Sequence, residues 1–578
     1  MAYEKLKCKF ANIKYVRPNY ENAKMEIKAC IRAIRSAKTY SEVRDSFLKV
    51  QDIIVNIDTA ASLCSIRSTL DKNDLFYENE DLENTKGYAS LSLVLKKFNA
   101  SLIESKFRDE LASEFGELYI KQIINEQKLI DKSIVSDIVK ENRLCQKYTK
   151  TVATCQTDFK GEECNFYGLL KHMEDDDRET RKDAFVLWAN LYESVSDKLD
   201  DIYDKLVYLR VNKAKKLGFD SYTDYAYLSL NRFDYNKEDV KRFREQVKKY
   251  IVPVANKLYL EQKERTRIDK MHWYDEAYVF VDGNPMPKGN KNELVEKANE
   301  MYHKLSKETG EFFDFMVKHD LFDLDTRPGK HLGGYCSFLP KYKAPFIFSN
   351  FNGTSADVGV LTHEAGHAFQ SFISSKHVAL DSQVWSTYEI CEIHSMSMEL
   401  FTYHWMNKFF GKDAKKYRYA HLSECIKTIP YLVAVDDFQH RVYEKPEMTA
   451  LERREEWKKI EKEYMPWRDY DGNKFLSDGG FWMQKQHIFL SPFYYIDYAI
   501  AQVCAFEFLI KSRINKAKAW KDYMKLCVLG GSKGYKDLLK EASLLDPLED
   551  GVVKPIIDDI EKVLEEFKLE LKTNKEWL

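Results

Sequence analysis

The residues best suited to chemistry lie in the segment TSADVGVLTHEAGHAFQSF, which begins at Thr354. His363 and His367 are four residues apart, so on a helix their imidazoles lie one above the other and can bind the same metal ion. Glu364 is rotated by about 100° from His363, which places it to hold a water molecule at the open position of that metal. The spacing predicts metal-assisted hydrolysis.

A helix must present these side chains, and the surrounding residues predict one. Thr354 and Asp357 are typical of a helix start, with the Thr354 hydroxyl accepting a free backbone N–H. The apolar face would consist of Leu361, Ala365, Ala368 and Phe372. Gly366 would lie inside this helix, where a glycine lowers the stability of the helix by about 1 kcal/mol relative to alanine. Either another backbone approaches closely there, or the glycine is simply tolerated.

A hydrolytic zinc site of the His-Glu-x-x-His type needs a third protein ligand. The stretch from Thr387 to Trp405 reads as a second helix, on which Glu392 and Glu399 share a face and Glu389 joins them at three residues' distance. One of these carboxylates could bind the metal and another could steady a ligand. Spacing alone does not choose among them. The candidates downstream of the motif are His377, Asp381, Glu389, Glu392, His394 and Glu399.

The HEAGH motif, followed after 24 residues by a glutamate in the context ExxSxxxE, resembles the oligoendopeptidase F branch of the thimet oligopeptidase-like zinc metallopeptidases. The resemblance implies one zinc ion per chain, held by His363, His367 and Glu392. It makes Glu364 the general base. Glu399 falls where a carboxylate outside the metal shell would steady a ligand histidine.

A second segment, HIFLSPFYYIDYAIAQ, is similar to the part of these peptidases that faces the zinc across the cleft. The resemblance implies catalytic roles for His487, Tyr495 and Tyr498, and contact of Tyr494 with the substrate. A phenol about 3 Å from the scissile carbonyl oxygen can stabilise the oxyanion. A Ser-Pro pair replaces the glycine-rich stretch of thimet-type members, so the choice among the three tyrosines stays open. Each could instead be a packed core residue.

Three short β-type runs precede the metal-binding helix. They are YVFV at 278–281, GGYCSF at 333–338 and PFIFSN at 345–350, and each is bounded by Gly or Pro. Their composition and spacing predict a small antiparallel sheet next to the zinc-binding helix.

The last of these runs reads as an edge strand, to which an extended peptide could add by backbone hydrogen bonds. On this hypothesis Phe348, Asn350 and Gly353 contact the substrate. Gly334 and Tyr335 would form a second backbone wall. A buried sheet is the alternative, and it is about as plausible for the Gly333-Gly334 segment.

Composition limits the fold and the partners. The 90 basic and 92 acidic residues give a net charge of -2, which argues against nucleic-acid binding. Only 13 prolines and 22 glycines in 578 residues indicate a mainly helical chain. A polar run at 172–183 suggests a boundary between an N-terminal helical domain (1–175) and a catalytic domain (176–578). The resemblance implies two helical lobes around a deep channel, with the N-terminal domain forming part of one wall.

No segment predicts export or membrane insertion. The N-terminus lacks the apolar stretch of a secretory signal. Residues 492–510 approach the length of a membrane span, but they contain Asp497, Gln502 and Glu507, so a buried helix is the better interpretation. The eleven cysteines, an odd number without a CxxC pair, are typical of reduced thiols in a cytoplasmic protein.

These observations predict a zinc endopeptidase that cleaves short oligopeptides by attack of a metal-bound water, with Glu364 as the base. Two alternatives stay open. The same motif could serve a carboxypeptidase or dipeptidase, or the protein could bind peptides without cleaving them. The sequence does not indicate peptide preference or oligomeric state.

Overall fold

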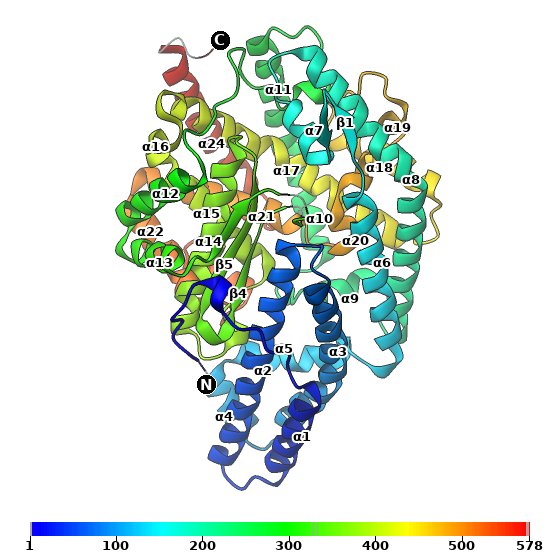
Figure 1. Ribbon diagram of the computed structural model, residues 1–578, viewed down its shortest axis with the longest axis vertical. Coiled ribbons are helices and arrows are strands. Elements are labelled where there is room, and N and C mark those ends of the chain that lie inside the picture. The colour runs from blue at the N-terminus through cyan, green and yellow to red at the C-terminus, as the bar shows by residue number, and fades with distance from the viewer. Residues whose placement is uncertain (1–2, 328, 332, 574–576, 578) are drawn as a thin grey trace.

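Helices dominate the computed structural model, which describes residues 3–327, 329–331, 333–573 and 577. The prediction of a mainly α fold is confirmed. Figure 1 shows the first helices projecting at one end of the molecule, with one end of α2 next to β4 of the small sheet. The helices of this projecting unit are α1 (Tyr20–Ser36), α2 (Tyr40–Leu70), α3 (Leu75–Ile103), α4 (Arg108–Phe115) and α5 (Glu117–Leu129).

The projecting unit has a hydrophobic core of its own. Phe47 lies at its centre, with its ring centroid 4.7 Å from that of Phe115 and 6.4 Å from that of Phe98. This core draws on residues 23–123 together with Leu380. The following helix, α6 (Val135–Ala153), instead packs on α8 (Arg178–Lys216) and belongs to the large core of the rest of the chain. A domain boundary near residue 175 therefore stays a prediction.

The middle of the chain adds a hairpin and a series of helices. The strands β1 (Thr157–Phe159) and β2 (Glu162–Cys164) pair antiparallel. The polar run at 172–183 ends one helix and begins the next, with the Asp177 side chain accepting the N–H of Thr180 at the start of α8. The remaining helices of this part are α7 (Phe166–His172), α9 (Tyr222–Ser229), α10 (Lys237–Gln246), α11 (Val252–Thr266), α12 (Lys291–Leu305) and α13 (Lys307–His319).

The last part of the chain carries the helices that position the candidate site. α14 (Ala356–His377) and α15 (Tyr388–Phe401) pack against each other, and α21 (Ile496–Ile514) packs on α15. α24 (Val553–Thr573) buries an apolar stripe from Ile560 to Leu571. The others are α16 (Met406–Phe410), α17 (Ala414–Glu444), α18 (Ala450–Tyr464), α19 (Lys474–Ser477), α20 (Gln486–Leu490), α22 (Lys516–Leu529) and α23 (Tyr535–Glu541).

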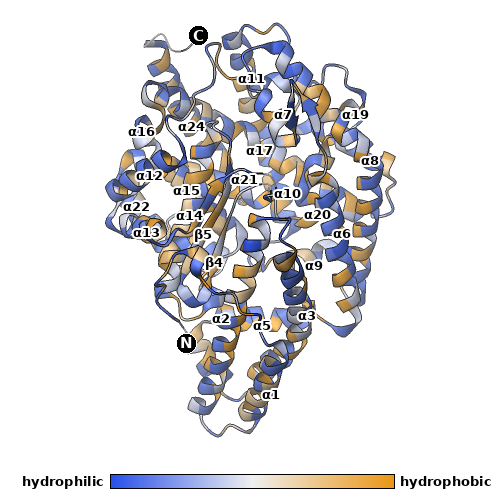
Figure 2. Cartoon of the chain, viewed as in Figure 1, coloured by the Kyte–Doolittle hydropathy of each residue, from blue (hydrophilic) through white to orange (hydrophobic). Residues whose placement is uncertain are grey.

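The sheet beside α14 is mixed, so the prediction of an antiparallel sheet is wrong in part. Its strands are β3 (Phe322–Asp325), β4 (Tyr335–Leu339) and β5 (Ala344–Phe351), in the order β3-β5-β4. β4 runs antiparallel to β5, but β3 runs parallel to it. β5 is therefore the central strand, and the prediction that it forms an edge is also wrong. Figure 2 shows it as largely hydrophobic, as a strand buried on both faces should be.

The run at 278–281 is not a strand. Its backbone carbonyls find partners on α11 instead of on a neighbouring strand: Gln262 Nε2 donates to the Tyr278 carbonyl at 2.9 Å, and Arg265 Nε donates to the Val279 carbonyl at 2.8 Å. Two long side chains on one helix thus satisfy the groups that a β ladder would have used. Sequence composition alone cannot distinguish these two arrangements.

The long apolar segment at 492–510 forms a loop and most of α21, which is buried within the protein as predicted. Its Asp497 is fully buried and accepts a hydrogen bond from Arg232 Nη2 at 2.7 Å. Across the described part of the chain, no helix combines the length and the apolar content that a membrane crossing requires.

Candidate active site

The two histidines of the motif lie on one face of α14, as their spacing predicts. Their ring centroids are 5.1 Å apart, and the side chains of His363 and His367 are 21% and 14% exposed. The helix start differs from the prediction. The Thr354 hydroxyl donates to Asn352 Oδ1 instead of capping the helix, while the Asp357 carboxylate accepts the N–H groups of Asn352 and Gly353 at 2.9 and 2.8 Å. Asp357 thereby ties the end of β5 to the helix.

Gly366 allows α15 to cross α14 at very short range. A Cβ at this position would lie 2.6 Å from Ser395 Cα and 2.8 Å from the His394 carbonyl oxygen. Real Cβ atoms do not approach a backbone so closely, so only glycine fits here. Of the two interpretations of Gly366, close approach of another helix is the correct one.

The close crossing brings Glu392 of α15 to both histidines. Glu392 Oε2 lies 3.3 Å from His363 Nε2 and 3.4 Å from His367 Nε2. Its side chain is 2% exposed. Ser395 Oγ donates to the same oxygen at 2.9 Å, and Tyr494 OH donates to Oε1 at 2.5 Å. The carboxylate is thus held in place by groups from its own helix and from the loop before α21.

These three side chains fit a metal ion. One ligand atom from each of them lies within 4.8 Å of the other two. Two imidazole nitrogens and one carboxylate oxygen are the donor set of hydrolytic zinc sites, in which one position stays open. The other predicted ligands lie elsewhere: His377 is exposed at the end of α14, His394 is buried against Tyr523, and Glu389 is buried near Arg232. Asp381 begins a short 3₁₀ turn beyond α14.

A second group of metal-binding residue types was not predicted. Glu162 and Cys164 on β2 and His172 at the end of α7 also place one ligand atom each within 4.8 Å of one another. Glu162 is exposed on the hairpin. This group lies on a different part of the fold from α14 and α15.

Glu364 lies next to the histidines and is buried, with 6% of its surface exposed. Its Oε2 has no hydrogen-bond partner among the described residues. Burial raises the pKa of Glu364, although the nearby imidazoles of His363 and His367 act in the opposite direction. A buried carboxylate with a free oxygen and a raised pKa is suited to accepting a proton.

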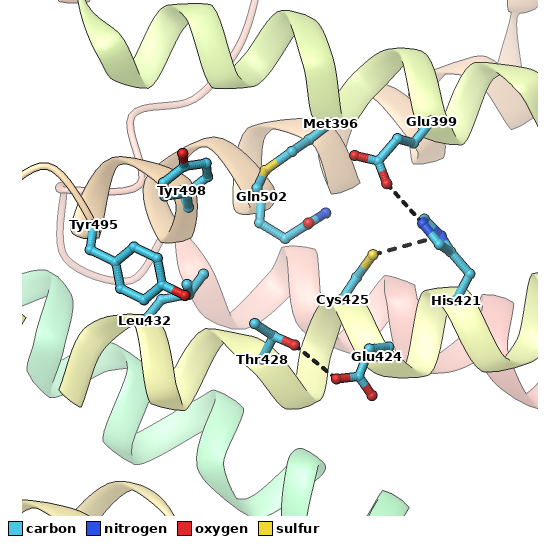
Figure 3. Close-up of a pocket in the computed structure, with 10 residues that line it drawn as sticks. All are labelled: Met396, Glu399, His421, Glu424, Cys425, Thr428, Leu432, Tyr495, Tyr498 and Gln502. Carbon is cyan, nitrogen blue, oxygen red and sulfur yellow. Dashed lines mark hydrogen bonds and ion pairs between the residues drawn. The ribbon is translucent and has the colours of Figure 1, made fainter. Parts of the chain in front are cut away.

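Glu399 connects His363 to a histidine that the sequence did not indicate. Its Oε1 lies 2.6 Å from His363 Nδ1. Its Oε2 lies 2.8 Å from Nε2 of His421 on α17, a contact that Figure 3 shows. Burial would raise the pKa of Glu399, but its hydrogen bonds to the two imidazoles outweigh this and lower it to about 2. Tyr403 OH contacts His421 Nδ1 at 2.6 Å, which extends the chain of contacts by one more residue.

His421 and Tyr403 carry no signal in the sequence. They lie 58 and 40 residues after His363. Tyr403 follows directly after α15, four residues beyond Glu399, whereas His421 lies on α17 and reaches Glu399 only through the tertiary fold. A search for histidines that could reach the predicted second carboxylate would have included His421 among several others.

The tyrosine cluster faces the histidines from the loop before α21 and from the first turn of that helix. Tyr494 OH donates to Glu392, and Tyr498 OH donates to Tyr494 OH at 3.1 Å. The ring of Tyr495 lies 4.6 Å from that of His487. Burial, together with the charge of Lys485, lowers the pKa of His487 to about 3, so its imidazole is neutral. The four residues predicted in this segment, His487, Tyr494, Tyr495 and Tyr498, thus lie on one side of the metal group, by which we mean His363, His367 and Glu392.

Arg232 holds this loop in position. It donates to the Phe493 carbonyl at 2.6 Å and to Asp497 at 2.7 Å, and it is fully buried. Phe493 has a φ of 66°, a left-handed conformation that a bulky residue adopts only when its surroundings impose it. The local strain is therefore offset by a buried ion pair at the point where Tyr494 turns toward Glu392.

The predicted substrate-binding residues of the sheet separate into two groups. The ring of Phe348 is fully buried and stacks on that of Tyr335 at 4.7 Å, while Asn350 Nδ2 donates to the carbonyls of His331 and Gly333. Because β5 is a central strand, both side chains make contacts inside the protein and hold the strands and the loop before β4 in place. Gly334 and Gly353 are exposed.

Gly334 adjoins Glu364. A Cβ at Gly334 would lie 3.5 Å from Glu364 Oε1 and 3.4 Å from the Phe348 carbonyl oxygen. The start of β4, an outer strand of the sheet, thus runs past the candidate base. The Tyr335 hydroxyl contacts Thr69 of α2 at 2.5 Å, so the N-terminal unit meets the sheet at the same place.

Two family descriptions match the chain. "Peptidase family M3" matches residues 171–556, and "Peptidase M3 N-terminal domain" matches residues 10–130. The first match covers more than half of the sequence.

Individual relatives agree with these matches. The solved structure of PZ peptidase A with an inhibitor is 44% identical, covering 96% of this chain and 99% of its own, with a TM-score of 0.94. A candidate oligoendopeptidase F from Bacillus anthracis is 40% identical, with 97% and 98% coverage and a TM-score of 0.90. An oligoendopeptidase F homolog from Borreliella burgdorferi is 24% identical over 567 residues, which is 90% of this chain and 93% of that protein. The chain belongs to peptidase family M3, in its oligoendopeptidase F branch, and is a metallopeptidase.

Proposed function

We propose that the protein is a zinc-dependent endopeptidase that hydrolyses internal bonds of short oligopeptides. The observation that carries this proposal is the meeting of His363, His367 and Glu392 beside the buried, partly unpaired carboxylate of Glu364. In this proposal the first three residues hold one zinc ion. When bound there, zinc would lower the pKa of a water ligand toward about 7 and polarise the peptide carbonyl.

Glu364 is the general base. It takes a proton from the water as the water oxygen attacks the carbonyl carbon, and it later delivers that proton to the leaving amine nitrogen. Its position supports this role, since one carboxylate oxygen is free to accept a proton and the side chain is largely shielded from bulk solvent. The exposed Gly334 leaves room for a peptide backbone next to this carboxylate.

The tyrosine cluster supplies hydrogen-bond donors for the oxyanion. Tyr498 is the best placed, because it is half-buried and its hydroxyl donates only to another phenol, from which it can turn to a substrate oxygen. Tyr494 holds the Glu392 carboxylate. The rings of His487 and Tyr495 are in contact with each other next to Tyr494 and Tyr498. There the neutral imidazole and the phenol can bind the peptide backbone.

Glu399 positions a ligand histidine. By accepting the Nδ1–H of His363 it leaves the Nε2 lone pair directed at Glu392 and His367, where a metal would bind. The backbone of the substrate peptide pairs with the outer strand β4, at Gly334 and Tyr335. It does not pair with β5, because β5 is the central strand and has a neighbour on each side.

The test uses a peptide that is blocked at both ends. Mass spectrometry of the products, with and without a chelator, should reveal internal cleavage that the chelator abolishes and zinc restores. A carboxypeptidase or dipeptidase would leave such a peptide intact while cleaving its unblocked form. The variant Glu364→Gln should keep its metal yet lose activity by about 10³-fold. If Glu364→Gln cleaves at the normal rate, Glu364 is not the base.

A further inference from the structure

A cavity of 380 Å³ lies between α15, α17 and the start of α21. Each helix presents residues at helical spacing to it: Met396 and Glu399 are one turn apart on α15, and Thr428 and Leu432 are one turn apart on α17 (Figure 3). The cavity is therefore built from three rigid elements, which suits it to recognising a ligand of defined shape.

The cavity adjoins the candidate metal group. Glu399 lines the cavity, and its carboxylate oxygen Oε1 contacts Nδ1 of His363. Tyr498 also lines it, and its hydroxyl is linked through Tyr494 to Glu392. A peptide with its scissile carbonyl at the metal group would therefore have one neighbouring side chain at the mouth of this cavity.

The walls of the cavity are mostly apolar. Met396 and Leu432 contribute aliphatic surface, and the rings of Tyr495 and Tyr498 contribute aromatic surface. Such walls stabilise a large apolar side chain by removing it from water, at about 25 cal/mol per Å² of buried area. The carboxylates of Glu399 and Glu424 in the same lining disfavour acidic side chains, and each is already paired with a neighbouring group, His421 and Lys427 respectively.

One buried polar group in the cavity has no partner. Gln502 on α21 lines the cavity and is only 6% exposed, and its Nε2 makes no hydrogen bond to any described residue. Figure 3 shows its amide directed across the cavity toward the side where Cys425 and His421 lie. An unpaired buried amide costs about 1–3 kcal/mol, so its presence in a cavity calls for a ligand that accepts this hydrogen bond.

We propose that this cavity is the subsite for one substrate side chain next to the scissile bond, and that it selects a large, uncharged side chain that ends in a hydrogen-bond acceptor. Tyrosine has this chemistry: its ring fits between the apolar walls, and its phenol oxygen can accept from Gln502. This inference rests on the proposed peptidase function and adds the substrate class to it.

The experiment compares blocked peptides that differ at one position at a time on either side of the cleaved bond. The residues compared are alanine, phenylalanine and tyrosine. At one of the two positions, the wild-type protein should favour tyrosine over alanine by about tenfold or more in kcat/KM, and over phenylalanine by a few-fold.

Two variants separate size from polarity. Thr428→Phe fills the cavity from α17, so the ratio of kcat/KM for the tyrosine and alanine peptides should fall to near 1. Thr428→Val has the size of threonine and should keep that ratio. Gln502→Leu should remove only the preference for tyrosine over phenylalanine. Thr85→Phe, the same enlargement at an exposed position of α3, controls for a general effect of the substitution.

The outcomes are distinguishable. If the wild-type protein cleaves no blocked peptide, the proposed function fails. If it cleaves them without a size preference at either position, or if Thr428→Phe leaves the ratio intact, only the subsite is refuted. Metal content and thermal unfolding show whether each variant is folded. If Thr428→Phe does not fold, Leu432→Ala, which enlarges the cavity, should shift the preference toward tryptophan, and an unchanged preference would overturn the assignment.

Discussion

Gly366 on α14 and Ser395 on α15 are in backbone contact, such that a Cβ at residue 366 would lie 2.6 Å from Ser395 Cα. This crossing determines how near Glu392 comes to the two histidines, because Glu392 lies one turn before Ser395 on α15. The metal group therefore depends on a residue that bears no functional group.

The variant Gly366→Ala should push the two helices apart. Overpacking of this kind costs about 1–3 kcal/mol, so we expect a lower unfolding midpoint and at least a tenfold loss of zinc affinity. The affinity is measured by competition with a chelator, independently of activity. Gly359→Ala on the same helix is the control, since its Cβ would meet only the Tyr417 hydroxyl at 3.9 Å. Equal zinc affinity in both variants would contradict the role of the crossing.

The carboxylate that binds the metal can be identified by metal content. Glu392→Ala should release zinc, because it removes the oxygen that lies 3.3 and 3.4 Å from the two imidazoles. Glu389→Gln should retain one zinc per chain, since Glu389 is buried near Arg232. Atomic absorption of the purified variants distinguishes them. Full zinc content in Glu392→Ala would transfer the ligand role to another carboxylate.

The two phenols next to Glu392 should have separable effects. Tyr498→Phe should lower kcat by about 10²-fold with unchanged zinc affinity, since its hydroxyl is proposed to bind the oxyanion. Tyr494→Phe removes the hydrogen bond to Glu392 and should weaken zinc binding. Kinetics at saturating substrate and chelator competition give the two quantities. A normal kcat for Tyr498→Phe would assign the oxyanion to another donor.

His421 should stabilise the metal site through Glu399. We expect His421→Phe to weaken zinc binding by about tenfold, because Glu399 loses one of its two hydrogen-bond donors and is held less firmly against His363. Tyr403→Phe, which removes the outer contact of His421, should have a smaller effect in the same direction. The rate of zinc transfer to a chelator is the measurement. A residue of purely structural importance would change the unfolding midpoint but not that rate.

Acid should destabilise the contact between α6 and α8 through Glu141. Glu141 accepts from Arg210 Nε at 2.7 Å and from Lys213 Nζ at 2.6 Å. Burial opposes its ionisation, but these two cations outweigh burial and lower its pKa from 4.5 to about 2. Because the folded-state pKa is depressed, the stabilisation is present above pH 4.5 and is lost as the pH falls toward 2.

The size of this effect follows from the shift, at about 3 kcal/mol for a group that is 15% exposed. Glu141→Gln should lower the denaturant midpoint at pH 7 and remove part of the acid sensitivity. Glu163→Gln, at an exposed position of β2, should change neither. If wild type and Glu141→Gln lose stability in parallel between pH 5 and 3, the ion pair is not the cause.

Much of the local structure follows from the sequence alone. Helical periodicity predicts α14, and the spacing of His363 and His367 places both imidazoles on one face, because both features depend only on the pitch of the helix. Low proline and glycine content predicts a mainly helical fold for the same local reason. For Gly366 the sequence offered two interpretations, a close contact or a tolerated glycine, and it could not choose between them.

Tertiary structure decided what depends on contacts between distant segments. Spacing could not choose among Glu389, Glu392 and Glu399, because all three lie on one predicted helix; the crossing at Gly366 directs Glu392 to the histidines and Glu399 to the far nitrogen of His363. The parallel strand β3 and the partner His421 were not predicted, since neither pairing leaves a trace in the local pattern. Sequence determines which groups a helix can present, whereas packing determines which of them meet.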